Sequence, residues 1–92
     1  PKSNMLEMDL IPEELKHIYW RSRRGLTELE MKLVPFARDC YLGLEHGEQV
    51  LYEALLSRED VEINDLLLRR VVPSDPALMA LIEKIIGHRG VL

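Results

Sequence analysis

The residue types best suited to recognition chemistry are concentrated between positions 19 and 28. This stretch contains the only tryptophan of the chain together with three arginines, a glycine and a glutamate, namely Trp20, Arg21, Arg23, Arg24, Gly25 and Glu28. A tryptophan beside arginines is typical of the residues that dominate protein–protein binding energy. These residues also have an ordinary structural explanation, because basic residues and glycine suit a helix end and acidic residues suit a helix start. The pattern predicts a turn between two helices that can also serve as a binding surface.

Residue patterns that support catalysis or metal binding are missing from the sequence. The three histidines, His17, His46 and His88, are too far apart to supply the closely spaced ligands of a metal site. Cys40 falls on the predicted apolar face of a helix, where a free cysteine usually behaves as a small hydrophobic residue. A glycine-rich phosphate loop with its lysine and hydroxyl residue is also missing. We therefore predict no catalytic residue, no cofactor-binding site and no metal site.

Length, charge and cysteine content restrict the class of protein. A chain of 92 residues is long enough for one domain and too short for two. Its net charge of -4 argues against a general binder of nucleic acid or anionic membranes. Its apolar runs are far shorter than the ~20 residues of a membrane span. Because Cys40 has no second cysteine to pair with and no cleavable signal pattern is visible, we expect a reducing cytosol.

Apolar spacing and the positions of proline and glycine predict five short helices. We expect them at about residues 12–25, 27–44, 50–55, 57–67 and 74–87. Strand signals are nearly absent, and the short links favour packing between helices that are neighbours in sequence. Residues 1–11 lack periodicity and are expected to form a flexible N-terminal segment, whereas residues 12–90 are expected to form a single domain. The predicted fold class is all-α, a compact five-helix bundle.

Local signals predict how these helices begin, end and pack. The expected capping pairs are Thr27 with Glu30, Ser57 with Asp60, and Asp75 with Pro76. Gly25 is expected to end the first helix in the left-handed conformation. The third helix is expected to bury Val50, Leu51, Ala54 and Leu55.

Trp20 is predicted to lie at the surface. If the first helix buries a face centred on Leu15, then Trp20 lies about 140° from that centre at 100° per residue. On the same wheel Arg24 lies about 180° from the centre. Arg21 and His17 fall within roughly 60° of Arg24. A large aromatic side chain directed away from the core and flanked by arginines favours a partner-binding role.

The turn resembles the signature of a known protein family. Residues 24–28 read Arg-Gly-Leu-Thr-Glu, which matches the RGxxE motif of the succinate dehydrogenase flavinylation factors, the SdhE family of small assembly proteins. The wider stretch 23–30, followed by Val34-Pro35-Phe36, is similar to the core signature of that family. Further residues that stand where the family tends to place them are Tyr41, Leu44, Glu48, Leu55, Leu56, Asp60, Pro73 and Asp75. The resemblance covers about residues 12–88.

The resemblance implies a five-helix bundle that is not itself an enzyme. Proteins of this family bind the flavoprotein subunit of succinate dehydrogenase, and in bacteria often that of fumarate reductase. They promote covalent attachment of FAD to a histidine of this client. FAD is therefore implied as the cofactor of the client, with no cofactor bound tightly by the helper itself. The implied protein is bacterial and cytoplasmic, is a monomer when free, and binds neither membrane nor nucleic acid.

The resemblance also implies roles for individual residues. Arg24 and Glu28 would make charge-assisted contacts across the client interface. Gly25 would allow a close approach of the client as well as capping the helix. The surrounding patch would consist of Trp20, Arg21, His17 and Leu26.

Two other functions are compatible with the residues alone. In the first, the protein is a small helical nucleic-acid-binding regulator or an antitoxin-like protein whose Arg21, Arg23 and Arg24 contact phosphates. Against this, the arginines fall at a helix C-terminus and are followed by acidic residues, whereas recognition helices usually read bases with their N-terminal part. In the second, the protein is a helical adaptor with no link to a flavoprotein.

Overall fold

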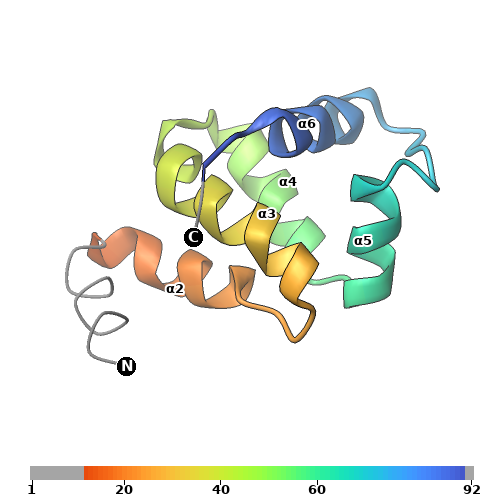
Figure 1. The fold of residues 1–92 in the computed structure, drawn as a ribbon. Coiled ribbons are helices and arrows are strands. Elements are labelled where there is room, and N and C mark those ends of the chain that lie inside the picture. The colour runs from red at the N-terminus through yellow and green to blue at the C-terminus, as the bar shows by residue number, and fades with distance from the viewer. Residues whose placement is uncertain (1–11, 91–92) are drawn as a thin grey trace.

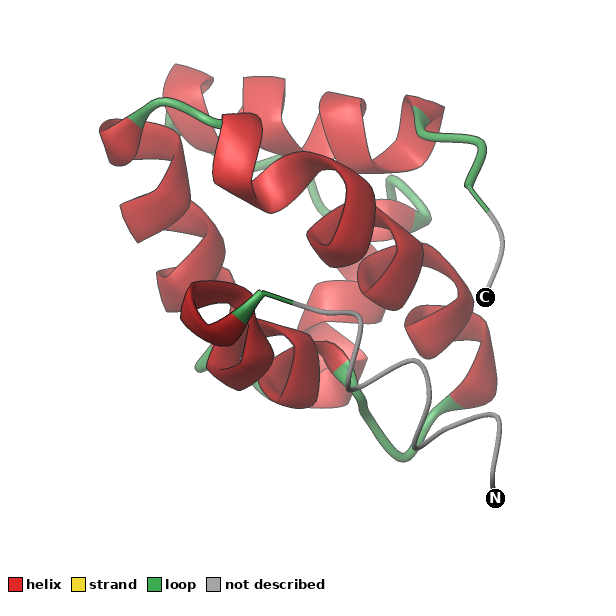
Figure 2. Ribbon diagram, turned by 90° about the vertical axis from the view of Figure 1, so that its left-hand side faces the viewer, coloured by secondary structure: helices red, strands yellow, loops and turns green. Residues whose placement is uncertain are grey.

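The computed structural model describes residues 12–90, which form five α-helices and one short 3-10 helix (Figure 1). In chain order they are α2 (Glu13–Ser22), α3 (Thr27–Cys40), η1 (Tyr41–Gly43), α4 (His46–Leu56), α5 (Asp60–Leu67) and α6 (Pro76–Gly87). In this part of the chain 73% of residues are helical and none is in a strand, as Figure 2 shows. The predicted all-α, five-helix fold is confirmed. The flexible segment expected at 1–11 lies outside the described residues.

Helix α3 is the central element of the bundle. It contacts α2, α5 and α6, while α4 packs against α2 and α6 (Figure 1). Leu29, Leu33, Phe36 and Ala37 of α3 are buried, at the 3.6-residue spacing that places them on one helix face. These residues form the buried face of α3, and Cys40 at the end of the helix is partly buried against the same core. None of the helices within residues 12–90 combines the length and apolarity that a membrane crossing requires.

One hydroxyl pair lies inside the apolar core. Ser22, at the end of α2, is completely buried, and its Oγ lies 2.7 Å from the hydroxyl of Tyr52. Ser22 Oγ also lies 2.9 Å from the main-chain oxygen of Ile18, and the Tyr52 hydroxyl lies 3.3 Å from the main-chain oxygen of Leu33. Each hydroxyl has one proton, so one of them donates to the other hydroxyl while the other donates to its main-chain oxygen. Because every buried polar atom of this pair has a partner, the pair ties α2, α3 and α4 together without a desolvation penalty.

Helix α4 is rotated relative to the face predicted for it. Val50 is 51% exposed and Ala54 is also exposed, whereas the buried residues are Tyr52, Leu55 and Leu56. The predicted face was wrong for Val50 and Ala54, because the larger Tyr52 ring is the one that packs inward. Tyr52 then packs against Phe36, with ring centroids 5.6 Å apart.

Two of the three predicted capping pairs do not form. Leu26, not Thr27, is the N-cap of α3, and no side chain caps it. Helix α5 begins with a reciprocal capping box between Glu59 and Glu62, so Ser57 does not cap it. The third prediction is confirmed, because the Asp75 side chain accepts from Ala77 N at 3.0 Å and Pro76 occupies the first turn of α6.

Candidate partner-binding surface

The turn between α2 and α3 is anchored at its backbone. Arg23 N donates to Trp20 O at 3.1 Å, which closes the last turn of α2. Arg24 N donates to Glu30 Oε1 at 3.1 Å, so a side chain of α3 reaches back to the turn. Arg23 Nε also lies 3.6 Å from Glu30 Oε1. Glu30 was expected to bond to the start of its own helix, and it instead holds the turn that precedes the helix.

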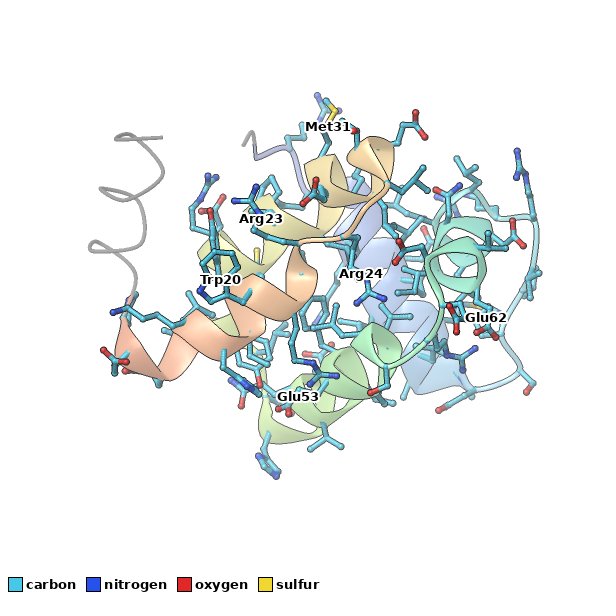
Figure 3. All side chains as sticks on the ribbon, turned by 90° about the horizontal axis from the view of Figure 1, so that it is seen from below. Trp20, Arg23, Arg24, Met31, Glu53 and Glu62 are labelled. Atoms are coloured by element: carbon cyan, nitrogen blue, oxygen red, sulfur yellow. The ribbon has the colours of Figure 1, made fainter. Side chains whose placement is uncertain are left out.

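The side chain of Trp20 lies at the surface, as predicted. Trp20 is 56% exposed, and the guanidinium carbon of Arg23 lies 5.9 Å from the centroid of its rings (Figure 3). This is a cation–π contact, which orders an exposed indole without burying it. An ordered, exposed tryptophan is well suited to insert into a partner, because little conformational entropy is lost on binding.

The side chain of Arg24 is bound inside the protein on several sides. Its Nε donates to Asp60 Oδ1 at 2.7 Å. Its Nη1 donates to the main-chain oxygens of Arg21 at 3.1 Å and Leu56 at 2.9 Å, and its Nη2 donates to that of Arg58 at 2.9 Å. The side chain is only 16% exposed, and Figure 3 shows it directed toward α4 and α5. The wheel placement of Arg24 opposite the core was wrong because α2 ends at Ser22, two residues earlier.

Gly25 is exposed and has no internal reason to be glycine. A β-carbon added at this position would meet no atom within 4 Å. None of the glycines in residues 12–90 has a positive φ, so the expected left-handed cap is wrong. Neither backbone conformation nor intramolecular packing therefore requires glycine here.

Glu28 and Met31 continue this surface along α3. Both are exposed, Met31 to 57%, and both line a shallow groove whose other wall is formed by residues 86–90. Within residues 12–90 the Glu28 carboxylate has no hydrogen bond or ion pair. Of the two charged residues in the RGxxE motif, Arg24 is thus bound internally and Glu28 is available to a partner.

The remaining predicted site residues do not form one patch. Arg21 faces α4, where its Nη2 donates at 3.0 Å to both the main-chain oxygen of Glu53 and the hydroxyl of Ser57. Leu26 is half-buried against the core. His17 is exposed on α2. The structure therefore separates Arg21 from the exposed face of Trp20 and turns it toward another helix.

Three residues that sequence reasoning did not assign to the site belong to it by position. Arg23 lies three residues after Trp20, the spacing of neighbours on a helix surface, and as the C-cap of α2 it contacts the indole. Met31 lies three residues after Glu28 in α3, and this spacing could have predicted that the two side chains lie next to each other on the helix surface. Asp60 stands at a position that the family resemblance named, but no spacing predicted its contact with Arg24, which spans 36 positions of the chain.

The titratable cluster at the other end of α3 has a different character. Cys40 Sγ lies 3.6 Å from His88 Nδ1, and His88 Nε2 lies 3.0 Å from Asp39 Oδ2. Burial and the nearby Asp39 carboxylate raise the pKa of the Cys40 thiol, which keeps it neutral and weakly nucleophilic. In the part of the chain that the structure describes, no group of three His, Cys, Asp or Glu residues is arranged to hold a metal ion.

Fold and surface together define a small all-helical protein-binding module, because its exposed turn presents an aromatic ring, a glycine and a carboxylate that has no partner among residues 12–90. The family model described as the flavinator of succinate dehydrogenase, Sdh5, matches residues 16–89. The chain belongs to this family.

Curated relatives agree with that assignment. The chain is 38% identical over 75 residues to the FAD assembly factor SdhE of Pseudomonas aeruginosa. These 75 residues cover 82% of this chain and 89% of the relative. It is 37% identical, with the same coverage, to the FAD assembly factor SdhE of Pseudomonas putida. It is 30% identical over 77 residues to that of Vibrio parahaemolyticus, covering 84% of this chain and 90% of the relative. The family resemblance stated from the RGxxE motif is confirmed.

Proposed function

We propose that this protein is an assembly factor that binds the flavoprotein subunit of succinate dehydrogenase and promotes covalent attachment of FAD to that subunit. The flavoprotein subunit of fumarate reductase is a second client of the same kind. Family membership supports the class of client. The observation that carries the site is Gly25, an exposed glycine that neither backbone conformation nor internal packing requires. A close approach of the client backbone would require it.

The chemistry of the surface defines what the client must present. The Glu28 carboxylate, which has no partner in the described part of the chain, calls for a cationic group of the client, an arginine, a lysine or a protonated histidine. The exposed Trp20 and Met31 side chains call for an apolar depression. Arg24 contributes to the same interface mainly by holding the turn in place, since most of its donors are used internally.

The helper acts by positioning and contributes no reacting group. The bond between flavin and client histidine forms through the chemistry of the flavin and of the client. Holding the client in an attachment-competent arrangement can lower the barrier by several kcal/mol. We assign FAD to the client on the basis of the family, and the first turn of α3 agrees, because its Glu28 and Glu30 repel the pyrophosphate that a helix N-terminus would otherwise attract.

The arginines of this region do not favour a nucleic-acid regulator. Arg21 lies 4.0 Å from Glu53, Arg23 lies 3.6 Å from Glu30, and Arg24 lies 2.7 Å from Asp60. Because each is paired with an acidic residue, they do not form the uncompensated basic surface that phosphate binding requires. We place the protein in the bacterial cytoplasm as a monomer that engages its client one to one.

Two exposed glycines provide a matched test of the proposed function. The flavoprotein subunit is co-expressed with wild-type helper, Gly25→Arg or Gly47→Arg, and its covalent flavin is measured by in-gel fluorescence. Neither glycine has an atom within 4 Å of its missing β-carbon, so both variants should fold. Gly25→Arg should reduce covalent flavin to the level seen without the helper, whereas Gly47→Arg should stay within about twofold of wild type. Equal flavinylation by all three proteins would contradict the proposed function.

A further inference from the structure

Arg24 connects the ends of three helices. The carbonyl of Arg21 lies in the last turn of α2, and that of Leu56 belongs to the last residue of α4. The carbonyls of a final helical turn lack partners within their own helix, so the guanidinium satisfies groups that would otherwise need water. The third carbonyl, that of Arg58, lies in the turn that leads to α5.

Asp60 supplies the only anionic partner of this guanidinium among residues 12–90. Its Oδ1 accepts from Arg24 Nε at 2.7 Å, and it is the first residue of α5, where the helix dipole stabilises a carboxylate. The Asp60 side chain is 36% exposed, against 16% for Arg24, so the pair lies at the edge of the core and not within it. The planar fork of arginine is needed to reach all four acceptors, which the single ammonium of lysine cannot do.

These contacts decide how the exposed part of the turn is held. A β-carbon added at Gly25 would face open space, so no packing holds this residue in place. The next residue, Leu26, is the N-cap of α3. The turn is therefore held on one side by Glu30, through Arg24 N, and on the other side by Asp60, through the Arg24 guanidinium. Loss of the Asp60 carboxylate removes the one charged partner that the Arg24 guanidinium has within residues 12–90, so that only neutral main-chain carbonyls hold the side of the turn that faces α4 and α5.

We infer that Asp60 is a positioning residue for partner binding, which acts through Arg24 to hold Gly25 and Glu28 in the arrangement that the client recognises. This inference rests on the proposed function for its partner. It requires no contact between Asp60 and the client. It also predicts that Arg24 and Asp60 act as one unit, so that their removal is not additive.

The test is a double-mutant cycle on binding of the purified flavoprotein subunit. Asp60→Asn, Arg24→Lys and the double variant are compared with Asp65→Asn, which removes another carboxylate of α5 whose partner is the exposed Arg70. Asp60→Asn should weaken binding about tenfold, and the double variant should bind no more weakly than the weaker single variant. Asp65→Asn should bind within about twofold of wild type. Asp60→Glu, which keeps the carboxylate, should recover part of the affinity.

Amide hydrogen exchange of the free helper tests the same inference without a client. Exchange at the hydrogen-bonded amides of the turn, those of Arg24, Leu29 and Glu30, should be faster in Asp60→Asn than in Asp65→Asn, while the core of α3 is protected equally in both. Unchanged binding by Asp60→Asn would overturn the inference, as would additive losses, which would show that Arg24 contacts the client independently. If the wild-type helper does not bind the flavoprotein subunit at all, the proposed function is contradicted. The exchange experiment then still tests the positioning role, which unchanged exchange at the turn in Asp60→Asn would overturn.

Discussion

The two ends of helix α3 treat their polar side chains in opposite ways. At the C-terminal end, Cys40, His88 and Asp39 bond to one another, and the His88 ring stands edge-on to Phe36 with centroids 6.0 Å apart. At the N-terminal end, Gly25 faces open space and the Glu28 carboxylate has no partner among residues 12–90.

This difference separates side chains that stabilise the fold from side chains that remain available for binding. Groups that satisfy each other contribute to the free energy of unfolding and would have to lose those bonds to bind anything else. An exposed group without a partner contributes little to stability, and its binding to a client forfeits no internal bond. The comparison therefore predicts stability defects from changes near the C-terminal end of α3 and binding defects from changes near its N-terminal end.

The largest expected effect is on stability, at Phe36. Phe36→Ala should lower the free energy of unfolding by about 3–5 kcal/mol, because it leaves a cavity beside Tyr52 and His88. Met31→Ala, five residues earlier on the same helix and 57% exposed, should change it by less than about 0.5 kcal/mol. Urea denaturation followed by circular dichroism measures both. If both variants lost the same free energy of unfolding, the proposed difference between the two ends of α3 would be contradicted.

The next effect is on binding, at Glu28. Glu28→Ala should weaken client binding by about 3 kcal/mol, or roughly 100-fold, since it leaves a cation of the client unpaired in the interface. Its free energy of unfolding should fall by less than about 1 kcal/mol, the size of a first-turn dipole contact.

Glu14, an exposed first-turn glutamate of α2, is the matched control for Glu28. Glu14→Ala should bind the client like wild type. If Glu28→Ala lost activity only by unfolding, the motif glutamate would be structural and its assignment to the interface wrong.

Trp20 combines a smaller binding effect with a direct optical readout. Trp20→Ala should weaken client binding by about 2 kcal/mol while costing far less stability than a core aromatic residue. Because Trp20 is the only tryptophan and is 56% exposed, emission of the free protein should be red-shifted and quenched by iodide. Addition of the client should protect it. Continued quenching in the complex would remove Trp20 from the interface.

The smallest effect is on alkaline stability, at the C-terminal end of α3. Burial and the hydrogen bond from its hydroxyl to Glu53 raise the pKa of Tyr41 to about 12, from 10.0. A raised pKa gives stability that is complete below pH 10, the unfolded value, and is lost as pH rises toward 12. Burial raises the pKa of Tyr52 in the same direction.

In wild type the free energy of unfolding should fall as pH rises toward 12, and in Tyr41→Phe this fall should be smaller by about 1–2 kcal/mol. Ionisation of Tyr52 should account for part of the fall that is left in the variant. Urea denaturation at intervals between pH 9 and pH 12 measures the slope. An unchanged slope in Tyr41→Phe would show that the hydroxyl is equally solvated in the folded and unfolded chains.

Short-range patterns were enough to predict much of the fold. The buried stripe of α3 through Leu29, Leu33 and Phe36 follows from 3.6-residue spacing, and the start of α6 follows from Asp75 and Pro76. Exposure of Trp20 followed from the same spacing once Leu15 was taken as the centre of the buried face. Each of these depends on residues within one or two helical turns of each other.

Other features depended on where a helix begins or ends, or on contacts between helices. The wheel position of Arg24 failed because α2 ends at Ser22, and the face of α4 failed because Tyr52 packs against Phe36 of α3, a contact between helices that no local pattern shows. Thr27 has the residue type of an N-cap, but the structure gives that position to Leu26. A residue beyond the end of a helix no longer follows the 100° step, so a boundary error of one or two residues changes the direction of the side chains at that terminus.

The sequence by itself determined that this protein is a small helical bundle with an RGxxE turn and an exposed tryptophan, because periodicity and motif are written in neighbouring residues. Only the tertiary structure decided which charge of the motif is available. Arg24 is bound by Asp60, Leu56 and Arg58, which lie 36, 32 and 34 positions away, whereas Glu28 meets no such group within residues 12–90. The physical reason is that a guanidinium binds the carbonyls and carboxylates that folding brings to it, and those come from distant helix ends that no local pattern encodes.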